Sequence, residues 1–156
     1  MRSRLFIWMK WLGIVAIVLF VSLLFLRNHL FVVRGSNMEP TYGDYTFGFI
    51  WRYSNTFERF DVVLYKRRQD LTNISRIVGL PGEKVEIKEG ALFIDGNRLD
   101  MSRYWINQPK AFGRFTLTLA PDQYALLSDN GHDGEATRLV TAGMIVGTFV
   151  YLPLGQ

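Results

Sequence analysis

The sequence predicts a mainly β domain that follows a single N-terminal transmembrane helix. Three observations support this fold class. A long apolar run opens the chain, short apolar or alternating runs separated by turn residues fill the rest, and no amphipathic helix of convincing length follows the first run. The chain has 156 residues, which is enough for an anchor and one domain of ordinary size.

The apolar run at residues 5–26 predicts the anchor. About 22 helical residues, at a rise of about 1.5 Å each, cover a hydrocarbon core of about 30 Å. Lys10 stands near the start of the run, where its stem can carry the ammonium to the headgroups, and Trp8 and Trp11 suit the same interface. A cleaved secretory signal is the alternative, but the run is too long and no small-x-small pattern follows it before Arg27.

Basic residues near the ends of the run predict the orientation. They are Arg2, Arg4 and Lys10 before the apolar core, and Arg27 and Arg34 after it. This slight bias favours a cytoplasmic N-terminus and a domain outside the cell membrane. We therefore divide the chain into a cytoplasmic tip and transmembrane anchor at residues 1–28 and one extracytoplasmic β domain at residues 29–156, with the lipid bilayer as the first partner.

Strands and turns are predicted from local patterns. The candidate strands are residues 45–51, 61–65, 74–78, 84–87, 91–94, 115–119, 124–127 and 144–152. Glu89-Gly90 turns the chain after the fourth of them, and Asp95-Gly96 suits a type I′ hairpin to a following polar strand. Pro81-Gly82 and Pro121-Asp122 mark two further turns, whereas residues 101–113 form an aromatic-rich connection that we assign to no element.

Composition excludes several classes of function. The absence of cysteine excludes a disulfide framework, a thiolate zinc site and a cysteine nucleophile. The net charge is +4, but the one dense basic run, Lys66-Arg67-Arg68, is too short to follow a nucleic-acid backbone, so we expect no nucleic-acid partner.

We predict no metal and no cofactor. His29 and His132 stand alone, and isolated histidines are more often surface residues than ligands. The acidic residues of the loop at 128–135 lack the ligand spacing of a calcium hand. This loop is predicted to be a structural turn, with cation binding as the lesser alternative.

Three motifs occur in order after the anchor: Gly-Ser-Asn-Met-Glu-Pro-Thr at 35–41, Arg-Ile-Val-Gly-Leu-Pro-Gly-Glu at 76–83, and Asp129-Asn130 with Arg138. Together with residues 60–65 and 143–147, they resemble the type I signal peptidase family, in particular its compact Gram-positive-type members. The resemblance implies a membrane-tethered, signal-peptidase-like antiparallel β fold. It also implies that active members use a serine nucleophile and a lysine base to cut signal peptides after small residues.

Both positions of this dyad are changed. The family serine stands immediately before the methionine of the first motif, where this chain has Asn37, and the family lysine stands immediately before the second motif, where it has Ser75. An amide cannot form an acyl-enzyme. A serine hydroxyl is also far too weak a base to replace a desolvated lysine with a lowered pKa. We assign no catalytic residue and expect no peptidase activity.

The third motif departs in the same sense, because the family's two serines and aspartate fall at Gly134, Thr137 and Ala136. A displaced nucleophile, Ser36, with Lys66 as a relocated base, is the alternative. On an extended segment, however, adjacent side chains point to opposite faces, so Ser36 would point away from the place that Asn37 faces unless a bulge redirects it.

Asn37, Met38, Pro40 and Ser75 are the expected substrate-binding residues, although Met38 and Pro40 could equally be core packing and a rigid turn. The leading hypothesis is an inactive family member that binds extended segments of secreted or surface proteins by strand addition. Inactive-looking relatives beside pilus and surface-protein assembly systems suggest such a role. The alternatives are an active signal peptidase that uses Ser36, and a structural membrane partner of a complete signal peptidase.

Overall fold

The computed structural model describes residues 2–52, 56–68, 71–102, 115–130 and 137–153. The chain separates into two compact units, Met1–Leu30 and Phe31–Gln156. The predicted unassigned connection at 101–113 lies outside the described residues except for its first two positions. The functional division at residues 28 and 29, with its placement of each part relative to a membrane, stays a prediction.

The first unit is the helix α1, Arg2–His29. Its segment Trp8–Arg27 has a mean hydropathy of 2.4, so it is long and apolar enough to cross a membrane. Large apolar side chains are exposed all along this segment, as expected of a helix without a polar face. The helix extends three residues past each end of the predicted run. At its C-terminal end, His29 Nδ1 lies 2.9 Å from the Phe25 carbonyl oxygen, and the two rings stack.

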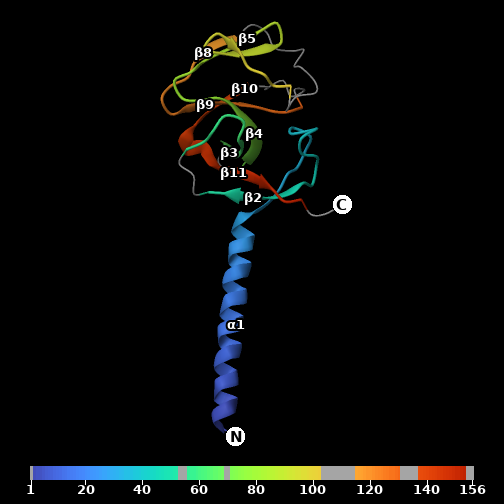
Figure 1. Ribbon diagram of the computed structural model, residues 1–156, viewed down its shortest axis with the longest axis vertical. Coiled ribbons are helices and arrows are strands. Elements are labelled where there is room, and N and C mark those ends of the chain that lie inside the picture. The colour runs from blue at the N-terminus through green and yellow to red at the C-terminus, as the bar shows by residue number, and fades with distance from the viewer. Residues whose placement is uncertain (1, 53–55, 69–70, 103–114, 131–136, 154–156) are drawn as a thin grey trace. The chain divides into compact units, whose positions relative to one another are not determined.

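The second unit consists of strands in two sheets (Figure 1). The strands are β1 (Leu30–Val32), β2 (Phe47–Trp51), β3 (Val62–Arg68), β4 (Leu71–Gly79), β5 (Lys84–Lys88), β6 (Ala91–Ile94), β7 (Asn97–Arg98), β8 (Phe115–Thr118), β9 (Gln123–Leu127), β10 (Thr137–Thr141) and β11 (Ile145–Tyr151), with a 3-10 turn, η1, at Ala142–Met144. The larger sheet has the order β1-β2-β11-β3-β4-β9-β10 and the smaller one β7-β6-β5-β8. Every pair whose register is described is antiparallel, which confirms the predicted fold class.

The predicted strands are all present, with shifted ends, and the predicted meander is confirmed. Glu89 and Gly90 have φ of 50° and 76°, and Asp95 and Gly96 have φ of 49° and 81°. Positive φ at both central residues is the signature of a type I′ hairpin turn. The sequence pattern does not reveal β1 or β10. It also misses the beginning of β4 and the end of β3, because polar side chains hide the alternation there.

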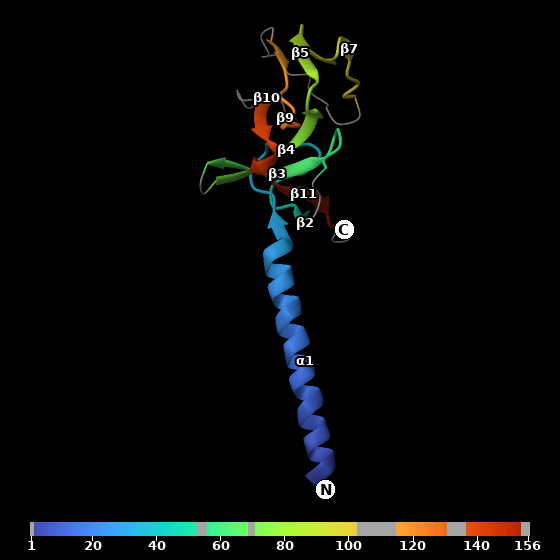
Figure 2. The same cartoon turned by 90° about the vertical axis from the view of Figure 1, so that its left-hand side faces the viewer.

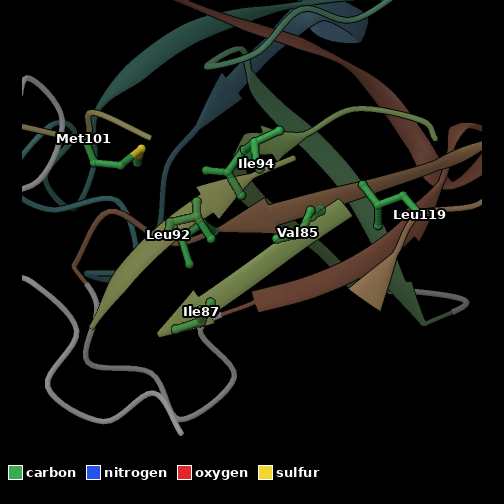
Figure 3. Close-up of a cluster of buried hydrophobic side chains, with 9 residues drawn as sticks. Val85, Ile87, Leu92, Ile94, Met101 and Leu119 are labelled. Atoms are coloured by element: carbon green, nitrogen blue, oxygen red, sulfur yellow. The ribbon is translucent and has the colours of Figure 1, made fainter. Parts of the chain in front are cut away.

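Three buried apolar clusters surround the strands. One joins Val78 of β4 and two residues of β9 to the smaller sheet; Figure 3 shows its members Val85, Ile87, Leu92, Ile94, Met101 and Leu119. A second joins the first motif, through Met38, to β2, β3, β4 and β11. The third lies around Val63 and Ile77. Because side chains alternate along a strand, Ile74, Arg76 and Val78 share one face of β4, while Ser75 and Ile77 share the other.

Gly79, at the end of β4, lies where the two sheets pack closely. A Cβ built there would be 2.7 Å from Val85 Cγ2 and 2.9 Å from Ala125 Cβ, whereas one built on Gly143 would meet no atom within 4 Å. We expect Gly79→Ala to lower the free energy of unfolding by about 1–3 kcal/mol, as overpacked cores do.

The measurement is thermal unfolding of the detergent-solubilised chain, followed by near-ultraviolet circular dichroism. Gly143→Ala is the matched control and should stay within about 0.5 kcal/mol of the parent. Equal effects from the two substitutions would show that the sheets do not pack tightly at Gly79.

Candidate functional site

The three motifs meet at a buried ion pair between Arg76 of β4 and Asp129, which follows β9. Arg76 Nε donates to Asp129 Oδ1 at 2.9 Å, and Nη2 donates to Oδ2 at 2.5 Å. The side chains are only 4% and 2% exposed. Two parallel N–H···O bonds fix both the distance and the relative orientation of the groups.

Other groups complete the hydrogen bonding of this pair. The Thr41 hydroxyl, from the first motif, donates to Asp129 Oδ2 at 2.5 Å, and Arg76 Nη1 donates to the Phe60 carbonyl at 3.0 Å. A buried charge is tolerated only when it is paired and hydrogen-bonded. One carboxylate therefore joins the first, second and third motifs.

The first motif folds as a turn, which corrects the expectation of an extended segment around Ser36. The Glu39 amide donates to the Ser36 carbonyl at 3.0 Å, and the Tyr42 amide donates to the Met38 carbonyl at 2.8 Å. Met38 is fully buried among the apolar side chains of the second cluster. Its thioether therefore anchors the turn, while Ser36 and Pro40 lie exposed.

Tyr42 closes the turn beside the ion pair and packs edge-on against Phe149, with ring centroids 5.1 Å apart. Burial raises the pKa of Tyr42 above its usual value. The Arg76 guanidinium opposes this rise in pKa, and the Asp129 carboxylate adds to it. The phenol is thus held neutral next to the buried charges.

Asn37, which the resemblance places at the family nucleophile position, lies beside the third motif. Its backbone carbonyl accepts a hydrogen bond of 3.2 Å from the Asn130 amide, and its side chain is half-buried. Ser75, which the resemblance places at the family base position, is buried in β4 opposite Val63 of β3. Its hydroxyl donates to the Ile74 carbonyl at 2.8 Å.

The remaining predicted residues lie elsewhere. Lys66 is exposed near the end of β3, and among the described residues no hydrogen bond joins it to Ser36. Thr137 begins β10, and its hydroxyl oxygen is buried with no hydrogen-bond partner in the described part of the chain. Gly134, Ala136 and the loop positions His132, Asp133 and Glu135 lie outside the described residues. Within the described ranges, no cluster of acidic or histidine side chains could hold a metal.

Reasoning from the sequence missed the ion pair, although one signal pointed to it. Arg76 is the only charged residue between Leu71 and Gly79, in an otherwise uncharged strand. A charge in such a run implies a buried partner, but nothing in the sequence identifies a residue 53 positions away.

Half of β4 has a free edge. β4 pairs with β3 from Leu71 to Arg76, but it pairs with β9 only from Arg76 to Gly79. On the β9 side, residues 71–75 therefore have no partner strand in the described part of the chain. The Ile77 amide and carbonyl bond toward β3, so the alternation of an antiparallel ladder directs the backbone groups of Ile74 and Thr72 to the free edge.

The end of β3 also has no second partner strand in the described part of the chain. β11 pairs with β3 only as far as Tyr65, so residues 66–68 and 71–75 form a two-stranded ribbon that extends beyond the rest of the sheet, shown by the paired green strands at the left of Figure 2. The β3 side of the ribbon carries exposed Lys66 and Arg67, and the β4 side carries no charge. Charged side chains discourage strand addition at an edge, which leaves the β4 edge as the accessible one.

Comparisons with known proteins agree with this architecture. The family model described as signal peptidase, peptidase S26, matches residues 5–152. The chain is 30% identical to signal peptidase I P of Bacillus subtilis subsp. natto, over 95% of this chain and 90% of the relative. It is 31% identical to a signal peptidase I of Bacillus amyloliquefaciens, over 99% of this chain and 92% of the relative.

A crystal structure of a signal peptidase I from Enterococcus faecalis has the same fold. It superposes with a TM-score of 0.50 at 24% identity and covers 61% of this chain and 97% of that one.

The buried ion pair should dominate the stability of the site. We expect Asp129→Asn to lower the free energy of unfolding by about 3–5 kcal/mol, because it leaves the Arg76 charge buried without a counter-charge. Chemical denaturation of the solubilised chain measures this loss. Glu83→Gln is the control, since it breaks the Arg59–Glu83 pair, whose side chains are 22% and 18% exposed, and it should cost less. A smaller loss for Asp129→Asn than for Glu83→Gln would contradict the central role of the pair.

Proposed function

Because this chain belongs to the signal peptidase I family, we propose that it is a membrane-anchored member without peptidase activity that binds extended segments of secreted or surface proteins. The free edge of β4 next to Ser75 carries this proposal. The α1 helix anchors the chain in the cell membrane, with the N-terminus in the cytoplasm and the β domain outside. Its ligands are therefore exported proteins, and assembly of a pilus or of surface proteins is the role that suits such binding.

The chemistry of the two dyad positions supports the loss of cleavage. The Asn37 amide has no hydroxyl to attack a carbonyl. The buried Ser75 hydroxyl already donates its proton to the Ile74 carbonyl. A neutral hydroxyl also lacks the basicity that a lysine of lowered pKa supplies.

The alternative with Ser36 as a displaced nucleophile finds no support in the contacts. Ser36 lies exposed in a turn, whereas Lys66 lies on the ribbon opposite Thr72. A general base must lie within hydrogen-bond reach of the proton that it removes. The described hydrogen bonds bring no base to the Ser36 hydroxyl.

The backbone of β4 supports binding. The carbonyl and amide groups of Thr72 and Ile74 face the free edge, where an extended segment can pair with them as an added strand. The floor beside this edge is fixed by the buried Met38 and by the Arg76–Asp129 pair. Ile74 is buried in the same apolar cluster as Met38, which holds the end of the edge next to Ser75 in place, so hydrogen bonds formed there cost little ordering.

Cleavage of a model preprotein by the detergent-solubilised chain tests the proposed inactivity. We expect no cleavage by the natural chain and detectable cleavage by the double variant Asn37→Ser with Ser75→Lys, because only the double variant has both a nucleophile and a base. Neither single variant should cleave the preprotein. Cleavage by the natural chain that disappears in Ser36→Ala would overturn the proposal in favour of an active peptidase.

Binding at the edge is tested with short dye-labelled peptides that overlap along the same preprotein, by fluorescence anisotropy. Thr72→Pro removes an amide that faces the free edge and should weaken the tightest peptide by about tenfold, at an unchanged unfolding temperature. Asn73→Pro is the matched control. It removes an amide that faces β3 and should lower the unfolding temperature instead. Undiminished binding by folded Thr72→Pro would exclude strand addition at β4.

A further inference from the structure

We propose that the segment bound at the free edge of β4 carries an acidic side chain at the position opposite Thr72, where Lys66 holds it. This inference rests on the proposed binding function and specifies the chemical class of its ligand. Three features lead to it: the distribution of charge on the ribbon, the register of its two strands, and the hydrogen bonds that already occupy Arg76.

Charge on the ribbon is confined to one strand. The two strands of the ribbon, residues 66–68 and 71–75, contain three basic residues and no acidic residue, and all three basic residues stand on β3. Asp70, between the strands, lies outside the described residues. Lys66 and Arg67 are exposed, whereas residues 71–75, which form the accessible edge, carry no charge. An added segment would therefore lie beside an uncharged strand with a row of cations directly behind it.

The register places Lys66 within reach of that segment. Lys66 is paired with Thr72, so their side chains are neighbours on one face of the ribbon, and both are exposed. Strands lie about 4.8 Å apart, so an added segment would be roughly 10 Å from β3. The lysine stem and a glutamate or aspartate side chain can together span this distance across the short threonine.

Other cations on this face do not compete. Arg76 shares the face of Thr72, but both of its outer nitrogens are engaged, one with Asp129 and one with Phe60. On the opposite face, Leu71, Asn73 and Ser75 offer no charge to the neighbouring positions of a bound segment. Arg67 follows Lys66 and therefore points to the opposite face, so Lys66 sets a preference for an acid only at the position opposite Thr72.

Because Lys66 is exposed, its ion pair with an acidic side chain of the bound segment should add little to the affinity. Ion pairs near a surface are worth about two- to fivefold in affinity, and salt screens them. Main-chain pairing would thus supply most of the affinity, and Lys66 would select among segments.

The experiment uses the detergent-solubilised full chain and the tightest preprotein peptide, remade with Glu, Gln or Lys at each position in turn. At one position, Glu should bind tighter than Gln, and Gln tighter than Lys, by about two- to fivefold per step at low salt. Lys66→Glu should reverse this order at the same position. Arg98→Glu makes the same charge change on the exposed β7 strand of the other sheet and should preserve the order.

The outcomes separate this inference from the function on which it rests. If peptides bind but their order is unchanged in Lys66→Glu, or is reversed equally by Arg98→Glu, the acidic ligand is excluded and the binding function stands. If none of the preprotein peptides binds, or if Thr72→Pro leaves their affinity unchanged, the binding function fails and this inference fails with it.

Discussion

The site depends on one buried carboxylate. Asp129 accepts hydrogen bonds from Arg76 in the second motif and Thr41 in the first, and it belongs to the third. Removing both charges from water costs several kcal/mol per ion, which is recovered only if every partner is in place. The turn that holds Asn37 and Met38, the middle of β4 and the end of β9 must therefore form together. None of these contacts involves the side chain of Asn37 or Ser75, so they do not depend on which residues occupy the two predicted dyad positions.

Under the proposed function, this separation of the buried ion pair from Asn37 and Ser75 would let a family member lose peptidase activity and keep its fold. Ser75 fits within β4 because its side chain is short and lies opposite Val63. Its hydroxyl donates a hydrogen bond to the carbonyl of the preceding residue, Ile74. A lysine there would bring a charge that has to be desolvated and oriented. A lysine in place of Ser75 would therefore not raise the stability of this chain. The free β4 edge, in contrast, owes nothing to the dyad, because it arises where β9 stops pairing.

Local features of the fold could be predicted from the sequence, and distant ones could not. The turns at Glu89-Gly90 and Asp95-Gly96 need positive φ at adjacent residues, and that requirement is visible in the residue types. The ribbon could not be predicted from the sequence, because the residues around Lys66 and Thr72 do not show the alternation of apolar and polar side chains that indicates a strand. The turn at Ser36 was mistaken for an extended segment, since its hydrogen bonds join backbone groups. The pairing of Arg76 with Asp129 depends on the order of strands in the sheet, which no single motif encodes.

The uneven charge of the ribbon also affects how copies of the chain meet. Open strand edges normally invite identical molecules to pair with one another. Two copies that met through β4 would each present residues 71–75, which contain no acidic side chain, so neither Lys66 would gain a counter-charge. A guest with a carboxylate opposite Thr72 would outcompete such self-pairing. Under the proposed binding, an edge that prefers an acidic segment would also oppose polymerisation of the chain through β4.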